Sequence, residues 1–207
     1  AEVFSLTPTK VLSGAEGGLV TTNDAGLADR LRLARDYGNP GDYDTRFVGL
    51  NGRLSELNAA MALASLDHLD EHVAHRNALA TRYRELLGQL GGIDFQQVPD
   101  GDRSSYKDFT ILIDKDGFGA GRDSVVAALH AEGIATRPYY SPPVHRQTAY
   151  RHLPERDLPV TDRLAGQVIS LPIWSHLPLE TVETICEAME QIHQHAHEIS
   201  DRVESTA

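Results

Sequence analysis

The pattern of apolar and polar residues alternates between strand-like and helix-like periods along the chain. Short apolar and β-branched runs bounded by turn-forming residues predict strands at residues 3–6, 18–22 and 109–113. Apolar residues at helical spacing predict helices that begin at Asn23 or Asp24, at Asp123 or Ser124, at Thr161 and at Pro178. A longer helical pattern covers residues 54–90 and ends at Gly91 and Gly92. This alternation of strands and helices predicts an α/β architecture.

Three segments lack such a period. Residues 39–49 contain glycine, proline, aspartate and two aromatic residues, and they predict a long loop of the kind that is often functional. Residues 134–140 are expected to be extended, with Pro138 favouring a strand edge or a strand end. The polar tail after Glu198 is expected to fray.

Composition and charge exclude several classes of partner. Hydrophobic residues make up 41% of the 207-residue chain and charged residues 24%, which is ordinary for a globular protein. No apolar run approaches the roughly 20 residues that cross a bilayer, so no membrane partner is expected. A formal net charge of −11 argues against a nucleic-acid partner, because phosphate binding needs a basic surface. Cys186 is the single cysteine, which excludes an internal disulfide and fits a reducing cytoplasm.

Lys10 is the residue with the most specific candidate chemistry. The chain has three lysines among its 19 basic residues, and Lys10 follows an apolar, β-prone stretch at residues 3–6. Burial of an unpartnered cation is costly and favours the neutral amine, which is the form that attacks a carbonyl to make a Schiff base. The spacing alone leaves two interpretations open: such a nucleophile, or a surface lysine near a strand end.

Four blocks of sequence stand out in order along the chain. They are residues 5–24 with S-x-x-x-T-K, residues 49–60 with G-x-N-x-R-x-x-E-L-x-A-A, residues 133–145 and residues 170–177. Together they resemble the DegT/StrS-type sugar aminotransferases, which are pyridoxal-phosphate (PLP) enzymes with the aspartate-aminotransferase fold.

The resemblance implies a domain organisation. Residues 1–71 would complete a large PLP-binding domain and begin a long interdomain helix, and residues 72–207 would form a small C-terminal α/β domain. In the family, a larger N-terminal portion precedes the lysine and carries the phosphate loop, the aromatic residue that stacks on the cofactor and the aspartate at its pyridine nitrogen. We therefore expect the chain to be the C-terminal part of a longer enzyme.

The resemblance also implies roles for three residues. In these enzymes the lysine that matches Lys10 binds PLP as a Schiff base, and the serine that matches Ser5 contacts the cofactor phosphate. Residues five apart on one strand face opposite sides, so a shared pocket requires the strand to end and turn before Lys10, which Pro8 favours. The asparagine that matches Asn51 reaches the partner subunit's site, which implies a homodimer with a shared active site.

Other polar residues keep two interpretations each. Arg53 either supports the site as a cation or pairs with Glu56 on a helix. Tyr139 and His145, together with the neighbouring Tyr140, match a segment near the cofactor pocket of relatives, so acceptor binding and plain packing both stay open. No metal is expected, because a solvated face suits the remaining histidine cluster better than a metal site. This cluster consists of His193, His195 and His197.

Residues and resemblance together predict a PLP-dependent aminotransferase of amino-sugar or deoxysugar biosynthesis. Its small-molecule partners would be an amino donor such as glutamate and, as the acceptor, a nucleotide-linked keto sugar. Related deoxysugar dehydratases have histidine at the lysine position, so Lys10 argues against that alternative. A non-catalytic regulatory protein of the same fold stays open as the other alternative.

Overall fold

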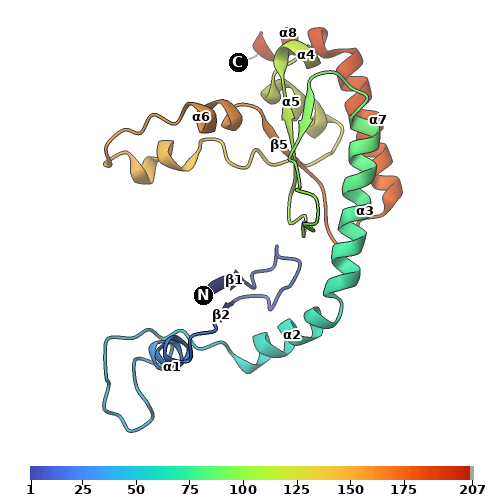
Figure 1. Ribbon diagram of the computed structural model, residues 1–207. Helices are drawn as coiled ribbons and strands as arrows, with labels where there is room; N and C mark the ends of the chain where they lie inside the picture. The colour runs from blue at the N-terminus through green and yellow to red at the C-terminus, as the bar shows by residue number, and fades with distance from the viewer. Residues whose placement is uncertain (206–207) are drawn as a thin grey trace. The chain divides into compact units, whose positions relative to one another are not determined.

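The computed structural model describes residues 1–205 and divides the chain into two compact units (Figure 1). The first unit is Ala1–His72 and the second is Val73–Ala207, so the division falls within one helix, α3 (Leu69–Leu87). Both units combine strands with helices, which confirms the predicted α/β class. Across residues 1–205, the helices lack the length and apolar character that crossing a bilayer would require.

The first unit follows the predicted strand and helix pattern closely. Its elements before α3 are β1 (Glu2–Ser5), β2 (Gly18–Thr21), α1 (Ala25–Ala34) and α2 (Glu56–Asp67). The two strands pair antiparallel, with Val3 opposite Val20. Asp24 caps α1, because its side chain accepts a hydrogen bond from the Leu27 N–H. The predicted loop at residues 39–49 contains no helix or strand.

The single helical stretch predicted over residues 54–90 is wrong, because the structure divides it into α2 and α3. His68 lies between them with φ −104° and ψ 4°, outside the helical region. One non-helical residue barely changes the apolar spacing on either side of it. The periodicity therefore gave no sign of the break.

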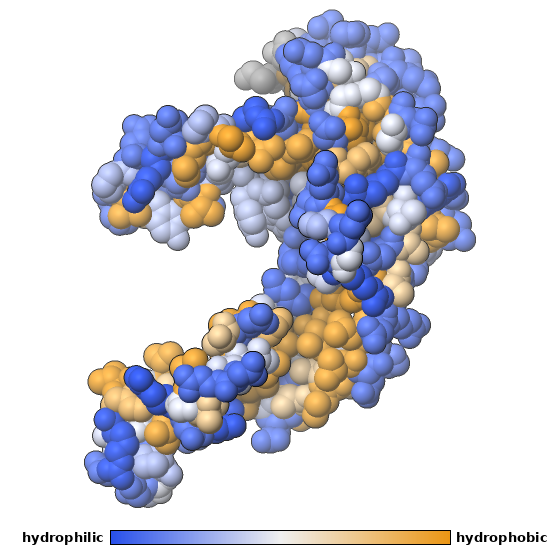
Figure 2. All heavy atoms as spheres, viewed as in Figure 1, coloured by the Kyte–Doolittle hydropathy of each residue, from blue (hydrophilic) through white to orange (hydrophobic). Residues whose placement is uncertain are grey.

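Apolar side chains of the first unit are largely uncovered. Leu6 and Val11 are its buried hydrophobic residues, and neither α1 nor α2 contains a buried residue. Figure 2 shows hydrophobic side chains gathered over the position of α2, where Leu57 is 80% exposed and Leu63 is 65% exposed. A helix that is apolar on all sides is typical of one enclosed by protein. The sequence of α2 is therefore that of a buried helix.

The second unit is built on a three-stranded antiparallel sheet with the order β3–β4–β5. Besides α3, its elements are β3 (Ile93–Phe95), β4 (Phe109–Ile113), α4 (Lys115–Phe118), α5 (Arg122–Ala131), the 3₁₀ turns η1 (Val144–Arg146) and η2 (Thr148–Tyr150), α6 (Pro159–Ala165), β5 (Val168–Leu171), α7 (Leu179–Gln194) and α8 (Ala196–Glu204). β4 coincides with the strand predicted at residues 109–113. The short elements β3, α4 and β5 were not predicted.

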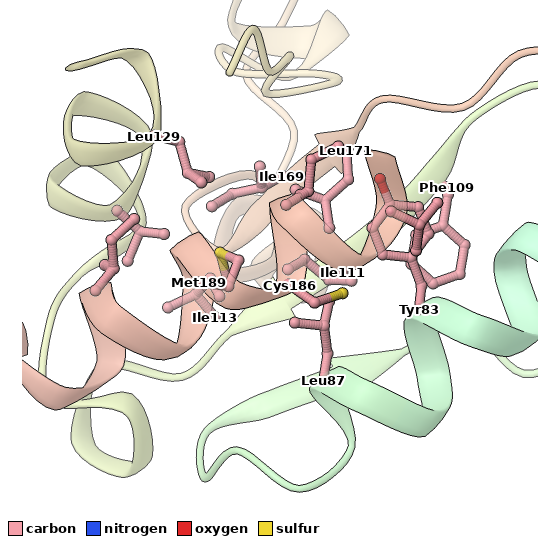
Figure 3. Close-up of a cluster of buried hydrophobic side chains, with 14 of the residues drawn as sticks. Tyr83, Leu87, Phe109, Ile111, Ile113, Leu129, Ile169, Leu171, Cys186 and Met189 are labelled. Atoms are coloured by element: carbon pink, nitrogen blue, oxygen red, sulfur yellow. The ribbon is translucent and has the colours of Figure 1, made fainter. Parts of the chain in front are cut away.

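One hydrophobic core holds the second unit together. Figure 3 shows side chains of α3 and α7 directed at those of the sheet. The Tyr83 ring stacks on Phe109 with centroids 4.8 Å apart, and its hydroxyl donates a hydrogen bond to the Pro172 carbonyl at 2.9 Å. Burial raises the pKa of Tyr83, so this hydroxyl stays protonated as a donor.

Two predicted helix starts differ from the structure. α5 begins after Gly121, whose backbone is extended, rather than after Asp123 or Ser124. Thr161 lies inside α6, which Pro159 opens because proline suits the first helical turn. Side chains that can cap a helix were present at both places, but the backbone begins to turn earlier.

One further expectation is wrong, and another holds only in part. Residues 199–204 belong to α8 instead of fraying, because Ala196 and Ser200 are buried and α8 packs against α5; the end of the predicted tail, residues 206–207, lies outside the described residues. Residues 134–140 form no strand, and their single ladder contact is an isolated bridge between Arg137 and Ser170. Packing in the folded unit decides both outcomes.

The buried thiol of Cys186 predicts a dependence of stability on pH. Burial raises the pKa of Cys186 to about 12, whereas an unfolded thiol has a pKa of about 8.5. Above that pH the unfolded chain releases a proton that the folded chain keeps. The free energy of unfolding should therefore fall by up to about 1.4 kcal/mol per pH unit because of this group.

Comparison of Cys186→Ala with the unsubstituted chain isolates this contribution, because the other groups titrate in both. We expect the variant to lose less stability between about pH 9 and pH 10.5, as measured by urea unfolding at each pH. Equal slopes in the two proteins would show that burial of the thiol does not couple to titration.

Candidate functional site

Lys10 lies on the connection between β1 and β2, residues 6–17, here named the Lys10 loop. β1 ends at Ser5, and the chain turns at once, with the Lys10 N–H donating to the Thr7 carbonyl at 3.0 Å. Pro8 stands within this turn. Lys10 is therefore not at the tip of a buried strand, since β1 is exposed and ends five residues earlier. The half-buried amine follows the kind of turn that a pocket shared with Ser5 requires.

Two of the three hydroxyl groups in residues 5–10, those of Ser5 and Thr7, lie close to each other. The Ser5 Oγ lies 3.2 Å from the Thr7 Oγ1 and accepts a hydrogen bond from the Thr7 N–H at 3.4 Å. In the part of the chain that the structure describes, the Lys10 amine makes no hydrogen bond or ion pair. This turn therefore combines an amine without a partner among residues 1–205 with a pair of neighbouring hydroxyls.

Helix α2 holds the Lys10 loop in place. The Asn58 side-chain amide donates to the Gly14 carbonyl at 2.6 Å, and the Ser13 N–H donates to the Ser65 Oγ at 3.2 Å. A Cβ at Gly14 would lie 2.8 Å from the Asn58 carbonyl oxygen, so only glycine permits this approach. Sequence analysis missed these contacts. An asparagine and a serine inside an apolar helix were the available signal, since both are weaker helix formers.

Asn51 and Arg53 form a separate group in the first unit. Asn51 is exposed and bridges Asp36 in an isolated antiparallel contact. The Arg53 Nε lies 3.4 Å from the Asp36 Oδ1, so its ion pair is with Asp36 and not with Glu56. Among residues 1–205, no hydrogen bond or ion pair joins Asn51 or Arg53 to Lys10.

In the second unit, residues 139–165 leave the sheet and return to β5; this segment is here named the arm (Figure 1). The arm and Val168 line a groove of about 1200 Å³. Tyr139 and Tyr140 lie in it with ring centroids 5.0 Å apart and planes inclined by 31°. His145 lines the same groove, and its Nε2 lies 3.0 Å from the Asp162 Oδ1. The structure therefore brings the predicted Tyr139 and His145 into one groove.

Asp162 ties the two sides of the arm together. The Arg146 Nε and Nη2 donate to its two carboxylate oxygens at 2.8 and 2.7 Å, in a bidentate pair that links η1 to α6. The hydrogen bonds from Arg146 are the main reason that the pKa of Asp162 is lowered. No sequence signal identified this pair, since its members are 16 residues apart.

Arg122 holds the base of the arm. Its side chain is only 7% exposed, and its Nε lies 2.6 Å from the Asp123 Oδ1. Its Nη1 donates to the carbonyls of Ala165 and Val168 at 3.2 and 3.4 Å, and its Nη2 donates to the Ser141 Oγ at 3.3 Å. A buried cation is tolerated when it has such partners. Arg122 thus joins the outgoing and the returning ends of the arm.

The histidine cluster does not share a single helix. His195 is the C-cap of α7, so His193 and His197 belong to different helices. His193 packs edge-on against Phe118, with ring centroids 4.9 Å apart. Within residues 1–205, no group of three or more potential ligands is arranged to hold a metal ion.

The sequence profile of the DegT/DnrJ/EryC1/StrS aminotransferase family matches residues 1–190 of the chain. The chain belongs to this family. Membership confirms the resemblance carried by the four sequence blocks. The matched residues include the whole first unit, with Lys10, and most of the second unit, with the arm.

Similar proteins extend the match. The chain is 36% identical over 188 residues to the erythromycin biosynthesis sensory transduction protein EryC1 of Saccharopolyspora erythraea, covering 89% of the chain and 50% of the relative. It is 37% identical over 199 residues to a dTDP-3-amino-3,4,6-trideoxy-alpha-D-glucose transaminase of Streptomyces venezuelae, covering 92% and 51%. The crystal structure of DesI with its TDP-sugar product superposes with a TM-score of 0.90 at 33% identity, covering 98% and 52%. The chain thus spans about half the length of these relatives.

Substitution of Gly14 tests the attachment of the Lys10 loop. Gly14→Ala places a methyl group 2.8 Å from a backbone oxygen of α2, so the loop should move away from the helix. We expect amide exchange at residues 13–16 to become at least about tenfold faster in hydrogen–deuterium exchange, because local opening is easier. Gly52→Ala is the matched control, since its methyl group would meet no atom closer than 3.7 Å. Unchanged exchange in Gly14→Ala would refute the role of this contact.

Substitution of Arg122 tests the base of the arm. Arg122→Met leaves two carbonyls and a hydroxyl unpaired, and we expect a loss of about 3 kcal/mol in the free energy of unfolding. Limited proteolysis should then cut the arm sooner than any other part of the second unit. The control is Arg163→Met, because Arg163 is exposed and its side chain binds only Gln167 among residues 1–205. Cleavage of the arm at the same rate in both variants would rule out this function of Arg122.

Proposed function

We propose that this chain forms the lysine-bearing part of a PLP-dependent aminotransferase. The enzyme moves an amino group from an amino acid, glutamate or a similar donor, to a keto sugar that is nucleotide-linked. The observation that carries the proposal is the Lys10 amine, which makes no hydrogen bond or ion pair among residues 1–205 and follows the paired hydroxyls of Ser5 and Thr7 along the chain of a family member. The named transaminase relative supports a sugar acceptor.

The side chains of Ser5, Thr7 and Lys10 fit PLP. A primary amine condenses with an aldehyde when it is neutral and has no competing partner. Hydroxyls such as those of Ser5 and Thr7 donate hydrogen bonds to phosphate oxygens, and these two lie 3.2 Å apart. When bound, PLP supplies an electron sink for the carbanion that forms at the amino-bearing carbon.

Lys10 has two tasks in this proposal. Its Nζ would hold the cofactor covalently in the resting enzyme. Once released, the same Nζ would act as the base that takes the proton from the carbon that bears the donor's amine. The same atom moves the proton in the opposite direction for the acceptor. The attachment of the Lys10 loop to α2 limits the space through which this amine can move.

We infer that the active protein is a homodimer in which Asn51 reaches the partner's site. Asn51 is exposed, and the loop before it presents Tyr43 and Val48 with exposures of 94% and 99%. Exposed apolar side chains of this kind favour a protein interface. In this proposal the first unit belongs to the large PLP-binding domain and the second is the small α/β domain. Cys186, buried and unpaired, favours the reducing cytoplasm as the location.

A regulatory role is the second candidate. It is favoured by the name of one relative, which is a sensory transduction protein. The presence of Lys10, Ser5 and Asn51 together favours the enzyme, because regulation alone does not require a reactive amine. Lys10 likewise disfavours the related dehydratases, which have histidine in its place.

Reduction with borohydride tests the proposal directly. The native protein is incubated with PLP, reduced and mapped by peptide mass spectrometry, which can distinguish the chain's three lysines. We expect the label on Lys10, its loss in Lys10→Ala and its retention in Lys107→Ala. Glutamate added before the borohydride should lower the labelling several-fold, because its amine competes with Lys10. No label, or a label confined to Lys107 or Lys115, would contradict the aminotransferase; a label that glutamate leaves unchanged would favour the regulatory role.

A further inference from the structure

Asn51 has a fixed backbone although its side chain is exposed. The Leu50 N–H donates to the Ala34 carbonyl at 2.7 Å, and the Tyr37 N–H donates to the Leu50 carbonyl at 3.0 Å. Asn51 itself pairs with Asp36 in an isolated antiparallel bridge. Ala34 is the last residue of α1, and Asp36 and Tyr37 follow it closely. The C-terminal end of α1 therefore fixes the backbone that carries Asn51.

Gly49 permits this close approach of the chain to α1. A Cβ at Gly49 would lie 2.3 Å from the Gly38 nitrogen and 2.7 Å from the Ala34 carbonyl oxygen. Both are backbone atoms, which cannot move aside as the end of a flexible side chain can. A larger residue in place of Gly49 must therefore push the segment with Asn51 away from α1.

Arg53 and Asp36 add a side-chain contact at the same place. The Arg53 Nε lies 3.4 Å from the Asp36 Oδ1, and the Arg53 guanidinium lies 5.8 Å from the centre of the Tyr37 ring. The two side chains of the ion pair are 58% and 44% exposed, so the pair adds little to the stability of the fold. Asp36 is the bridge partner of Asn51, and Arg53 follows Asn51 by two residues. The pair thus restrains the backbone around Asn51.

The Asn51 side chain keeps its own bonding capacity. It makes no hydrogen bond with any residue between 1 and 205. Its amide offers two N–H donors and one oxygen acceptor. A fixed backbone lowers the entropic cost of ordering such a side chain when it binds a ligand. The arrangement is therefore that of a binding group on a rigid support.

We propose that Gly49, Asp36 and Arg53 are positioning residues for the PLP site of the partner subunit. They act through Asn51, whose amide they hold at a fixed place on the surface of one protomer. The inference rests on the proposed function, in which Asn51 reaches the partner's site. It gives Arg53 the task of holding Asn51 in place, through Asp36, and not that of binding a ligand.

The dissociation constant of PLP, measured by equilibrium dialysis of the native protein, tests the role of Gly49. We expect Gly49→Ala and Asn51→Ala each to weaken PLP binding by about tenfold, because both remove the same hydrogen bond to a charged ligand. The double variant should bind PLP no more weakly than Asn51→Ala alone, since effects that pass through one group do not add. Gly52→Ala is the matched control and should bind PLP as the native protein does, because its methyl group would meet no atom closer than 3.7 Å.

Two variants of Arg53 test the ion pair without adding atoms that clash, so they serve even where Gly49→Ala does not fold. Arg53→Gln should weaken PLP binding by about threefold, the size expected for an exposed pair, and Arg53→Lys should restore most of the affinity. In the background of Asn51→Ala, Arg53→Gln should have no further effect. A further loss there would show that Arg53 binds the ligand itself and would overturn its positioning role.

Hydrogen–deuterium exchange separates the support from its function. Gly49→Ala should make amide exchange at Leu50 at least about tenfold faster, because the bond to the Ala34 carbonyl opens more easily. Faster exchange with unchanged PLP affinity would overturn the inference. Losses of PLP affinity that add in the double variant of Gly49 and Asn51 would overturn it as well.

The inference and the proposed function fail with different results. A borohydride label on Lys10 together with native PLP affinity in Gly49→Ala and Arg53→Gln would defeat the positioning role and leave the aminotransferase standing. A native protein without PLP on Lys10 would defeat the aminotransferase and the positioning role with it.

Discussion

The close approach of Gly14 to α2 is the contact on which the candidate chemistry depends. It lets Asn58 hold the Lys10 loop through a backbone carbonyl, while Ser65 holds the neighbouring N–H. The loop is thus fixed by groups other than its own lysine, and the amine keeps its bonding capacity for a ligand. A nucleophile needs this combination, because a fixed position lowers the entropic cost of reaction and a free amine preserves reactivity.

Buried arginines organise the loops of the second unit in the same way. Arg122 joins both ends of the arm, and Arg76 on α3 donates to the Ser175 Oγ and to the Tyr106 carbonyl. Burial lowers the pKa of Arg76, and the nearby Asp108 opposes this shift. A guanidinium group has several donors in one plane, so one side chain can connect segments that no strand pairing orders. The sheet and its core provide the support for these connections.

The first unit, unlike the second, leaves most of its apolar side chains exposed. Its α2 is largely apolar and has no buried residue, while the chain spans about half the length of its relatives. In the proposed enzyme, further protein covers this surface. The Lys10 loop lies on the side of α2 that carries Asn58 and Ser65, so these two polar residues of the helix bind the loop. This division explains why polar residues interrupt an otherwise apolar helix.

Local sequence determined the α/β class, β4, the Asp24 cap and the loop at residues 39–49, because periodicity and turn residues act over short distances. Lys10 became the candidate only through the family resemblance, since its spacing left two interpretations open. Only the tertiary structure decided the long-range contacts and the fold of α8 (Ala196–Glu204). The contacts are those of Asn58 with Gly14, Arg122 with Ala165 and Asp162 with His145. The hydrogen-bonded partners Asn58 and Gly14 are 44 residues apart, and Arg122 and Ala165 are 43 apart. Such contacts form because packing brings the segments together, and no local pattern encodes them.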